Sequence, residues 1–281
     1  MDVSASAPAR SWLFVPATRP DRYAKAAASG ADRVILDLED AVAPNEKEGA
    51  RRQLAAAMIP RDVPVYVRVN SALTPWFDED LATAARLDIR GILLPKADSA
   101  SHVERAAAKI AGHQAVVPII ETALGDWNVL EVARAARVER LVFGALDFTL
   151  DTGIHDADGA FDAVRSRIVI ASRIAGIASP VDLVTIAIDD QELLKRHADR
   201  ARHFGFGGKL CIHPKQIPVT NAAFRPTDDE IAWARAVLAE LATRPEDAVF
   251  AYRGELVDRP VIDRARQIVT AAGPLTAGDR G

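Results

Sequence analysis

Short apolar runs recur along the chain and alternate with longer stretches in which apolar residues return every three or four positions. Runs of roughly four to eight residues rich in valine, isoleucine and leucine are typical of strands buried on both faces. The longer stretches have the helical period, and a glycine or a serine marks some of their ends. The predicted strands are 11–15, 33–38, 63–69, 91–94, 116–120, 140–143, 181–185 and 209–212. The predicted helices between them are 20–29, 45–57, 78–87, 99–111, 129–137, 161–175 and 189–204.

This alternation predicts an α/β fold, a (β/α)8 TIM barrel over residues 10–215. An open doubly wound sheet is the alternative. Such a sheet often carries a glycine-rich phosphate turn after its first strand, and Pro16-Ala17-Thr18-Arg19-Pro20 stands there instead. The barrel is therefore preferred.

The remaining residues, 216–281, exceed what a barrel needs and predict a C-terminal helical extension. It holds one clear helix, 227–242, and a second, 260–272, after a turn at 253–255. We expect the extension to pack on the barrel or on a neighbouring subunit. Residues 1–9 are rich in alanine, serine and proline and lack a basic segment followed by an apolar one, so we expect a disordered terminus rather than a signal peptide.

The composition limits the partners and the compartment. The chain has 281 residues, 49% of them hydrophobic, which is enough for one large core. The net charge is −4 with acids and bases interspersed, which argues against a nucleic-acid partner. No apolar run approaches the roughly 20 residues of a membrane span. The single cysteine, Cys211, excludes an intramolecular disulfide and indicates a cytoplasmic protein.

Two carboxylates stand at the ends of apolar runs. Glu121 closes the fifth predicted strand, and Asp147 follows the sixth. The active site of a TIM barrel lies at this end of its strands, and two oxygen donors from adjacent strand ends suit Mg²⁺. Taken singly, either residue would be read as a solvated loop acid. The ends of other strands carry further polar residues: Asp37, Glu39, Asp40, Arg68, Asn70, Lys96 and His213.

Among these residues, Arg68 follows an otherwise apolar strand and could hold a carboxylate or an enolate oxygen in bidentate fashion. It could also form an ion pair with the acids of residues 37–40. For Lys96 we favour an ion pair over a Schiff-base nucleophile. His213 lacks partner histidines at zinc-ligand spacing, which argues against zinc and for a packed or hydrogen-bonded residue. No Gly-x-Ser-x-Gly elbow and no Walker loop is present in the sequence.

Seven motifs, in this order, resemble the citrate lyase β-subunit-like family of the HpcH/HpaI aldolase superfamily. The resemblance covers residues 10–272. The motifs are RSWLFVPATRP (10–20), VILDLEDAV (34–42), VYVRVNS (65–71), GILLPKAD (91–98), PIIETALG (118–125), LVFGALDFTLDTG (141–153) and GFGGKLCIHPKQI (205–217).

The resemblance implies a (β/α)8 barrel, a homotrimer or a hexamer, that binds Mg²⁺ and cleaves or forms a C–C bond beside a thioester. It implies that Glu121 and Asp147 are the metal ligands and contact the substrate. Arg68 corresponds to the clamp on the substrate carboxylate or enolate. Glu39 and Asp40, within the acids of 37–40, correspond to catalytic residues that hold the metal's water shell.

Three more positions carry implied roles. Arg19 and Lys25 correspond to positions that hold coenzyme A phosphates. Asp258, in GELVDRP (254–260), corresponds to the acid/base of the family, which often comes from a neighbouring subunit. Ala17 is a departure, because the family commonly has glycine after Val-Pro, and a Cβ restricts the backbone there.

The expected function is a Mg²⁺-dependent C–C lyase. It would cleave or form a β-hydroxyacyl-CoA of the malyl, citramalyl or citryl type, giving a 2-oxo acid or glyoxylate plus acyl-CoA. One alternative is a lyase subunit of a larger complex that acts on an acyl-carrier protein, and Asp258 favours the free-standing enzyme. A second is a metal aldolase that produces pyruvate without a thioester, against which Arg19 and Lys25 argue. A third is a non-catalytic protein that only binds coenzyme A or a metabolite, and the run of metal, clamp and acid positions argues against it.

Overall fold

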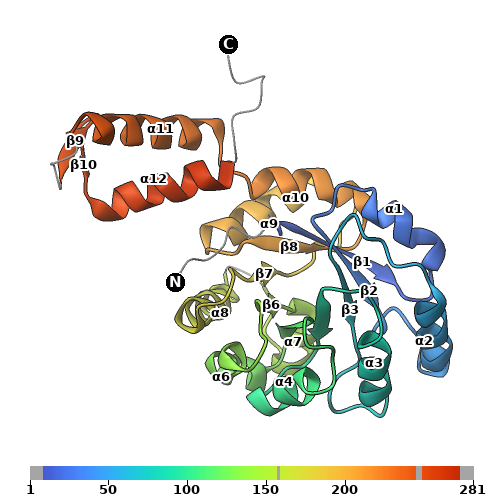
Figure 1. The fold of residues 1–281 in the computed structure, drawn as a ribbon. Coiled ribbons are helices and arrows are strands. Elements are labelled where there is room, and N and C mark those ends of the chain that lie inside the picture. Colours follow the sequence, from blue (N-terminus) through green and yellow to red (C-terminus); the bar gives the residue numbers. More distant parts are fainter. Residues whose placement is uncertain (1–8, 157–158, 245–248, 273–281) are drawn as a thin grey trace. The chain divides into compact units, whose positions relative to one another are not determined.

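Eight parallel strands close into a barrel in the order of the sequence, and helices surround it (Figure 1). The computed structural model describes residues 9–156, 159–244 and 249–272. The ring closes because β1 pairs with both β2 and β8, which confirms the predicted (β/α)8 barrel. The strands are β1 (Ser11–Pro16), β2 (Arg33–Asp37), β3 (Val65–Arg68), β4 (Gly91–Leu94), β5 (Ala115–Ile120), β6 (Val142–Phe143), β7 (Val181–Asp182) and β8 (Gly208–Cys211).

The segments that connect the strands are mainly helical. Ser99 caps α4, since its side chain accepts a hydrogen bond from the amide of His102, in agreement with the predicted start of that helix. Three short helices, α5, α7 and α10, were not predicted. The helices of this part of the chain are η1 (Pro20–Arg22), α1 (Tyr23–Ala27), η2 (Pro44–Glu46), α2 (Lys47–Ala56), α3 (Phe77–Ala84), α4 (Ala100–Ala107), α5 (Ala123–Trp127), α6 (Val129–Arg134), α7 (Ala145–Thr152), α8 (Asp162–Ala175), α9 (Gln191–His203), η3 (Pro214–Gln216) and α10 (Ile217–Ala223).

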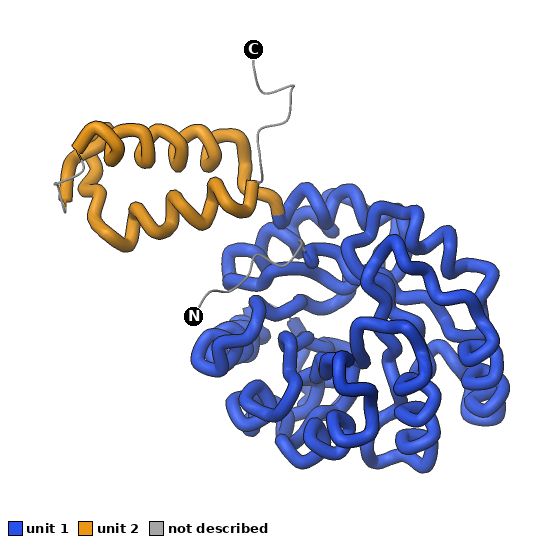
Figure 2. The backbone as a smooth tube through the Cα atoms, viewed as in Figure 1, with its two compact units in different colours: residues 1–224 blue, residues 225–281 orange. Residues whose placement is uncertain are grey.

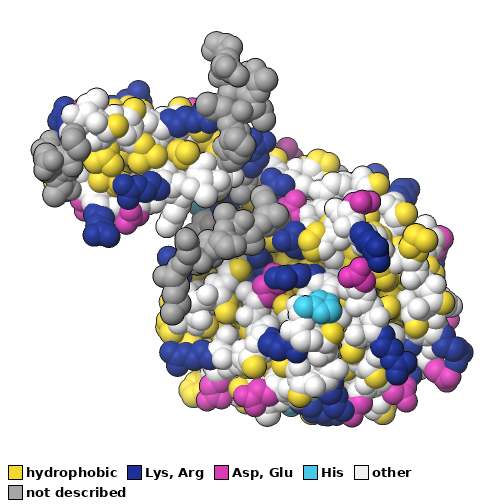
Figure 3. Space-filling view, in the orientation of Figure 1, with side chains coloured by type: hydrophobic (Ala, Val, Ile, Leu, Met, Phe, Trp, Pro, Cys, Tyr) yellow, Lys and Arg dark blue, Asp and Glu magenta, His cyan; other side chains and the backbone are white. Residues whose placement is uncertain are grey.

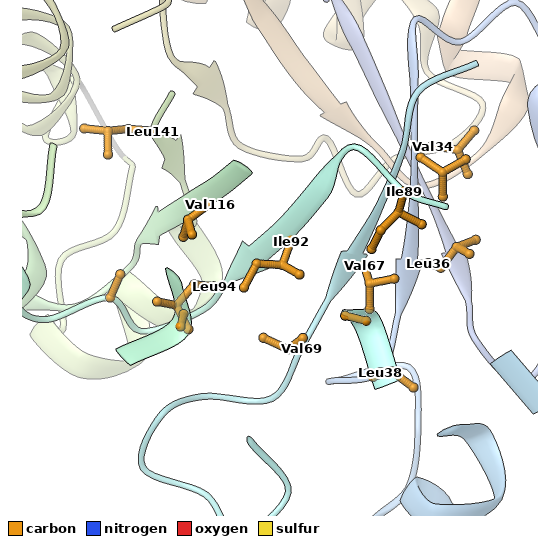
Figure 4. Packing of buried hydrophobic residues seen from close by; sticks show 14 of the residues in the cluster. Val34, Leu36, Leu38, Val67, Val69, Ile89, Ile92, Leu94, Val116 and Leu141 are labelled. Atoms are coloured by element: carbon orange, nitrogen blue, oxygen red, sulfur yellow. The ribbon is translucent and has the colours of Figure 1, made fainter. Parts of the chain in front are cut away.

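The strands bury both of their faces, as the apolar runs predicted. Side chains that point outward form one apolar layer under the helices, and Figure 4 shows part of it, including Val34 and Leu36 of β2. Side chains that point inward fill the barrel, among them Trp12, Ile35 and Tyr66. Because side chains alternate along a strand, Asp37 faces inward two residues after Ile35, and Arg68 does so two residues after Tyr66. The alternation thereby brings two charged groups to the carboxyl end of the barrel.

The chain divides into two compact units, residues 1–224 and 225–281 (Figure 2). The prediction placed the end of the barrel at residue 215, whereas α10 belongs to the first unit. The reason is that α10 packs against α9 and β1 and buries Ile217 and Thr220, as the helix after the eighth strand should.

The second unit is a pair of helices joined by a β-hairpin. A capping box of Thr227 and Glu230 starts the first helix. The turn of the hairpin is built on Arg253 and Gly254, which have φ of 50° and 83°, and two positive values suit a tight hairpin. The hairpin strands were not predicted, although the turn and both helices were. The elements are α11 (Asp228–Thr243), β9 (Phe250–Tyr252), β10 (Glu255–Val257) and α12 (Arg259–Ala272).

Acidic and basic side chains mix on the face of the first unit in Figure 3, in keeping with the interspersed charges of the sequence. None of the helices within the described ranges is long and apolar enough to cross a membrane. The predicted disordered terminus, residues 1–9, lies outside the described residues except for Ala9. Ala9 is buried, and its carbonyl accepts a hydrogen bond of 2.8 Å from the indole nitrogen of Trp12.

Candidate active site

The guanidinium of Arg68 lies among three acids at the carboxyl end of the barrel. Arg68 pairs in register with Asp37, and its Nε and Nη2 donate to the two oxygens of Asp37 at 2.7 and 2.6 Å. Its Nη1 lies 3.0 Å from Glu39 and 3.1 Å from Asp40. Burial alone would lower the pKa of Arg68, but the carboxylates, Asp37 foremost, raise it above its ordinary value. The predicted ion pair is therefore present, and the guanidinium stays charged.

The side chain of Lys96 contacts three carboxylates of the same cluster. Its ammonium lies 3.1 Å from Asp147, 3.2 Å from Glu39 and 3.8 Å from Glu121. Its backbone has φ of 49°, a left-handed conformation unusual for lysine, and its amide donates to Glu121 Oε1 at 2.8 Å. Burial would lower the pKa of Lys96, but the carboxylates outweigh it and raise the pKa. Because a Schiff-base nucleophile must be a neutral amine, the structure supports the ion pair for Lys96.

Glu121 directly follows β5 and is buried, and Asp147 lies in the first turn of α7. Gly144 precedes α7 and passes close to Glu121. A Cβ at Gly144 would lie 2.4 Å from Oε2 of Glu121, so a larger residue would displace that carboxylate. This role of Gly144 was not predicted, although the residue stands in the motif LVFGALDFTLDTG (141–153). A glycine between a buried strand and an acid was the available signal.

The cluster has more negative than positive groups. Five carboxylates surround two cations, Arg68 and Lys96. Burial raises the pKa of Glu121 to about 8, and the nearby carboxylate of Glu39 adds to the effect. Burial likewise raises the pKa of Glu39 to about 7. A bound cation would offset this cost of crowding and desolvation.

The donor set fits a hard divalent cation. All the candidate donors are carboxylate oxygens, which Mg²⁺ prefers, and Glu121 and Asp147 both approach one ammonium. Within the described part of the chain, no three His, Cys, Asp or Glu side chains are grouped so that they could hold a metal by themselves. Glu121 and Asp147 would therefore hold the ion with water or substrate, an arrangement common for Mg²⁺.

A cavity lies at the cluster, and a second cavity adjoins it. One, of about 400 Å³, is lined by Arg68, Glu121 and Asp147. The other, of about 590 Å³, is lined by basic residues of the first βα segment and by His213. Phe14, Pro16 and Ile212 line both cavities. The basic residues of the second cavity are Arg19, Arg22 and Lys25.

Comparisons with known proteins agree with this arrangement. A sequence model of the HpcH/HpaI aldolase/citrate lyase family matches residues 10–214. The chain belongs to this family. It is an enzyme of the oxo-acid lyase type, as predicted.

Relatives in the family are similar over nearly their whole length. The citrate lyase subunit beta-like protein of Mycobacterium tuberculosis is 39% identical, covering 99% of this chain and all of the relative. A (3S)-malyl-CoA thioesterase of Cereibacter sphaeroides is 34% identical and covers 96% of each chain. The crystal structure of CitE from M. tuberculosis in complex with magnesium, acetoacetate and coenzyme A has a TM-score of 0.84 at 38% identity, covering 95% of this chain and 99% of that one.

The structure of the present chain brings most of its predicted site residues together. Glu39, Asp40, Arg68, Glu121 and Asp147 form one cluster. Their individual roles stay predictions.

The other predicted residues lie outside the cluster. Arg19 and Lys25 line the adjoining cavity, where Arg19 also forms an exposed ion pair of 2.7 Å with Asp21. His213 accepts a hydrogen bond of 3.2 Å from the amide of Lys215, as expected for a hydrogen-bonded residue. Asp258 belongs to the second unit, where its Oδ1 accepts a hydrogen bond of 3.3 Å from the amide of Val261 at the start of α12, and its role as acid/base stays a prediction.

Proposed function

We propose that the protein is a Mg²⁺-dependent lyase that cleaves a β-hydroxyacyl-CoA into a 2-oxo acid or glyoxylate and an acyl-CoA, and also runs in reverse. The pair of adjoining cavities carries this proposal. One is acidic with a single arginine, and the other is basic. A thioester with a long phosphorylated tail and a reactive oxygen-rich end fits two such cavities. The names of the relatives support the same substrate class.

The basic cavity suits the phosphates of coenzyme A. Arg19, Arg22 and Lys25 lie within two short consecutive helices and line one cavity. Coenzyme A ends in a phosphorylated adenosine diphosphate. Three basic groups suit a ligand with several phosphate charges. The same residues have no function in an aldolase that acts on free hydroxy-oxo acids.

Glu121 and Asp147 would hold Mg²⁺. When bound, the ion acts as a Lewis acid that polarises the substrate oxygen destined to become the carbonyl. The amide of Lys96 fixes Glu121 from one side, and Gly144 leaves space on the other. Glu39 and Asp40 position water beside these carboxylates in this proposal.

The remaining chemistry falls to Arg68 and Asp258. Cleavage leaves an enolate on the thioester half, and Arg68 stabilises its oxygen. Because Asp37 holds two donors of the guanidinium, its orientation is set before substrate enters. Asp258 delivers a proton to the α-carbon during cleavage, which balances the proton that the substrate hydroxyl loses as it becomes the carbonyl, and Asp258 removes the α-proton during synthesis. The proposal includes a homotrimer or hexamer in which Asp258 comes from a neighbouring subunit.

Turnover of malyl-CoA and citramalyl-CoA with and without Mg²⁺ tests this function. We expect acetyl-CoA plus glyoxylate or pyruvate, only with the metal and without any partner protein. Release of free coenzyme A with the hydroxy acid intact would identify a thioesterase instead. A requirement for a carrier protein, or cleavage of free hydroxy-oxo acids at an equal rate, would overturn the proposal.

A further inference from the structure

The loop that follows β2, residues 38–42, carries two acids of the cluster, Glu39 and Asp40. Oε1 of Glu39 accepts a hydrogen bond of 3.2 Å from the ammonium of Lys96. Its Oε2 is buried and, although Arg68 lies 3.0 Å away, receives no hydrogen bond from a described residue. Asp40 is exposed and contacts Arg68 at 3.1 Å. The positions of both carboxylates therefore depend strongly on the backbone of the loop.

Asp37 holds the amides of this loop. Its Oδ1 accepts a hydrogen bond of 2.9 Å from the amide of Glu39, and its Oδ2 accepts one of 3.2 Å from the amide of Ala41. The same carboxylate also accepts two hydrogen bonds from Arg68. One side of the loop is thus fixed by an acid that belongs to the cluster itself.

Lys47, the first residue of α2, holds the carbonyls of the loop. Its ammonium donates to the carbonyl oxygens of Leu38 and Glu39, each at 2.7 Å. The side chain is buried, and the ammonium lies 5.3 Å from the centre of the Trp76 ring. A buried ammonium is costly unless its hydrogen bonds are made, and such charge-assisted bonds are strong. The two bonds therefore tie the start of α2 firmly to the loop.

A second set of buried hydrogen bonds reaches the same loop. Nδ2 of Asn70 donates to the carbonyl of Leu38 at 3.0 Å and to Asp80 at 2.6 Å. Asp80, on α3, also accepts from the amide of Asn70 at 2.9 Å and from Nη1 of Arg51 at 3.1 Å. Arg51 lies one helical turn after Lys47 on α2. Both helices that follow β2 and β3 thus support the loop with buried polar side chains.

We infer that Lys47 is a positioning residue of the lyase: by holding the carbonyls of Leu38 and Glu39, it sets the loop so that Glu39 and Asp40 face Arg68. Lys47 is not among the described residues that line the two cavities, so it acts through the loop and not on the substrate. Oε2 of Glu39 is then left to accept a hydrogen bond from the water that the proposed function assigns to it. The inference rests on that function and adds a residue to it.

Hydrogen–deuterium exchange tests the loop directly and needs no turnover. Lys47→Met keeps an apolar stem and removes the ammonium. We expect the amides of residues 38–42 to exchange at least about tenfold faster, because opening the loop no longer breaks two charge-assisted hydrogen bonds. Lys209→Met is the matched control, since Lys209 is fully buried and its ammonium also donates to a carbonyl, that of Leu183 at 2.6 Å. This control should leave the exchange of the loop unchanged.

Two results of the exchange experiment would overturn the inference. One is unchanged exchange of residues 38–42 in Lys47→Met. The other is an equal acceleration in Lys209→Met, which would mean that the loss of any buried lysine loosens the loop.

Steady-state kinetics with malyl-CoA and citramalyl-CoA separate positioning from substrate binding. We expect Lys47→Met to lower kcat by about 10- to 100-fold, the usual cost of losing a group that orients a functional side chain. KM should stay within about twofold of the wild type, since the cavity proposed for coenzyme A is lined by residues of 13–26 and 212–214. A raised KM at wild-type kcat would contradict a positioning role.

The two measurements also keep this inference apart from the proposed function. If the wild type cleaves no thioester, the proposed function is wrong, and the exchange experiment alone decides whether Lys47 holds the loop. If Lys47→Met does not fold, Lys47→Gln takes its place, because its amide is one bond shorter and should not reach both carbonyls. The expected and the contradicting results are the same for that variant.

Discussion

The two ends of the barrel both bury charged side chains, with opposite balance. At the amino-terminal end, Arg90 and Arg140 gather around one acid, Glu139. At the carboxyl end, five carboxylates gather around Arg68 and Lys96. Charged side chains therefore gather beside both ends of the strands, and their presence alone does not mark an active site.

The amino-terminal end uses its charges for packing. The hydroxyl of Tyr66 donates to both oxygens of Glu139 at 3.1 and 3.2 Å, and burial raises the pKa of Tyr66 to about 12. The guanidinium of Arg140 stacks 5.4 Å from the centre of the Trp12 ring, which in turn lies 4.8 Å from the ring of Tyr66. Aromatic rings thus fill the space between these charges. This end is a structural plug.

The carboxyl end differs because a cavity adjoins its charges and because its acids outnumber its cations. Carboxylates in a cavity that lack enough cations favour the binding of a metal ion, whereas charges paired between aromatic rings do not. Charge balance and open volume together therefore distinguish a site from a plug. The following substitutions should affect one end and spare the other.

Loss of a proposed metal ligand should have the largest effect. Glu121→Gln and Asp147→Asn keep the side-chain shape and remove a charged donor. We expect each to abolish measurable Mg²⁺ binding and to lower kcat by about a thousandfold, since Lewis-acid stabilisation is worth several kcal/mol. Calorimetric titration with Mg²⁺ and steady-state kinetics measure both effects. The exposed Glu131→Gln is the matched control, and wild-type Mg²⁺ affinity in Glu121→Gln would refute the assignment.

Asp258→Asn should separate proton transfer from metal binding. We expect exchange of the acetyl-CoA α-protons into deuterated water to fall by about 10²- to 10⁴-fold, the usual contribution of a general base. Mg²⁺ affinity should not change. The control is Asp263→Asn on α12 of the same unit. Unchanged exchange in Asp258→Asn would remove this residue from the mechanism.

Gly144→Ala should disturb the carboxyl end through packing alone. The added Cβ would meet Oε2 of Glu121 at 2.4 Å and force the carboxylate to move. We expect Mg²⁺ affinity to fall by about 10- to 100-fold, as when a supporting group of a metal ligand is lost. Gly112→Ala is the control, because nothing lies within 4 Å of a Cβ at Gly112. Wild-type affinity in Gly144→Ala would mean that Glu121 does not bind the metal.

Gly144 also marks the limit of what the sequence could predict. The eight strands and most of the long helices were predicted because burial imposes a clear period on them. The clustering of Glu121, Asp147 and Arg68 was predicted because parallel strands end at one rim. The contact between Gly144 and Glu121 was not, since it depends on the path of the chain between β6 and α7.

The missed helices have a related cause. α5 and α7 begin within three residues of the ends of β5 and β6, so their sequences were interpreted as the polar ends of these strands. Local signals were nevertheless present, since the side chain of Thr122 caps α5 and Gly153 ends α7. The left-handed backbone of Lys96 is a third example, because lysine itself does not favour that conformation. Arg22 was missed because its alignment with Arg19 and Lys25 along one cavity depends on the turn of η1 into α1.

The pH dependence of Mg²⁺ binding sharpens the difference in charge balance. Because the pKa of Glu121 is raised to about 8, this carboxyl is largely protonated at pH 7, and protons compete with the metal. Affinity should therefore rise with pH, by about tenfold between pH 7 and pH 9, and level off above that range. Titrations in a series of buffers at constant ionic strength measure this change. An affinity independent of pH would show that Glu121 is ionised throughout.

Glu139→Gln tests the plug at the amino-terminal end and should have the smallest effect on catalysis. The amide can still accept a hydrogen bond from Tyr66, but it no longer offsets the charges of Arg90 and Arg140. We expect the free energy of unfolding in urea to fall by about 2 kcal/mol, the cost of leaving partly buried charges unpaired. Mg²⁺ affinity and kcat should stay at wild-type values, and the exposed Glu104→Gln should change neither stability nor kinetics. If Glu139→Gln weakened Mg²⁺ binding, the two ends would be energetically coupled, and the division into plug and site would fail.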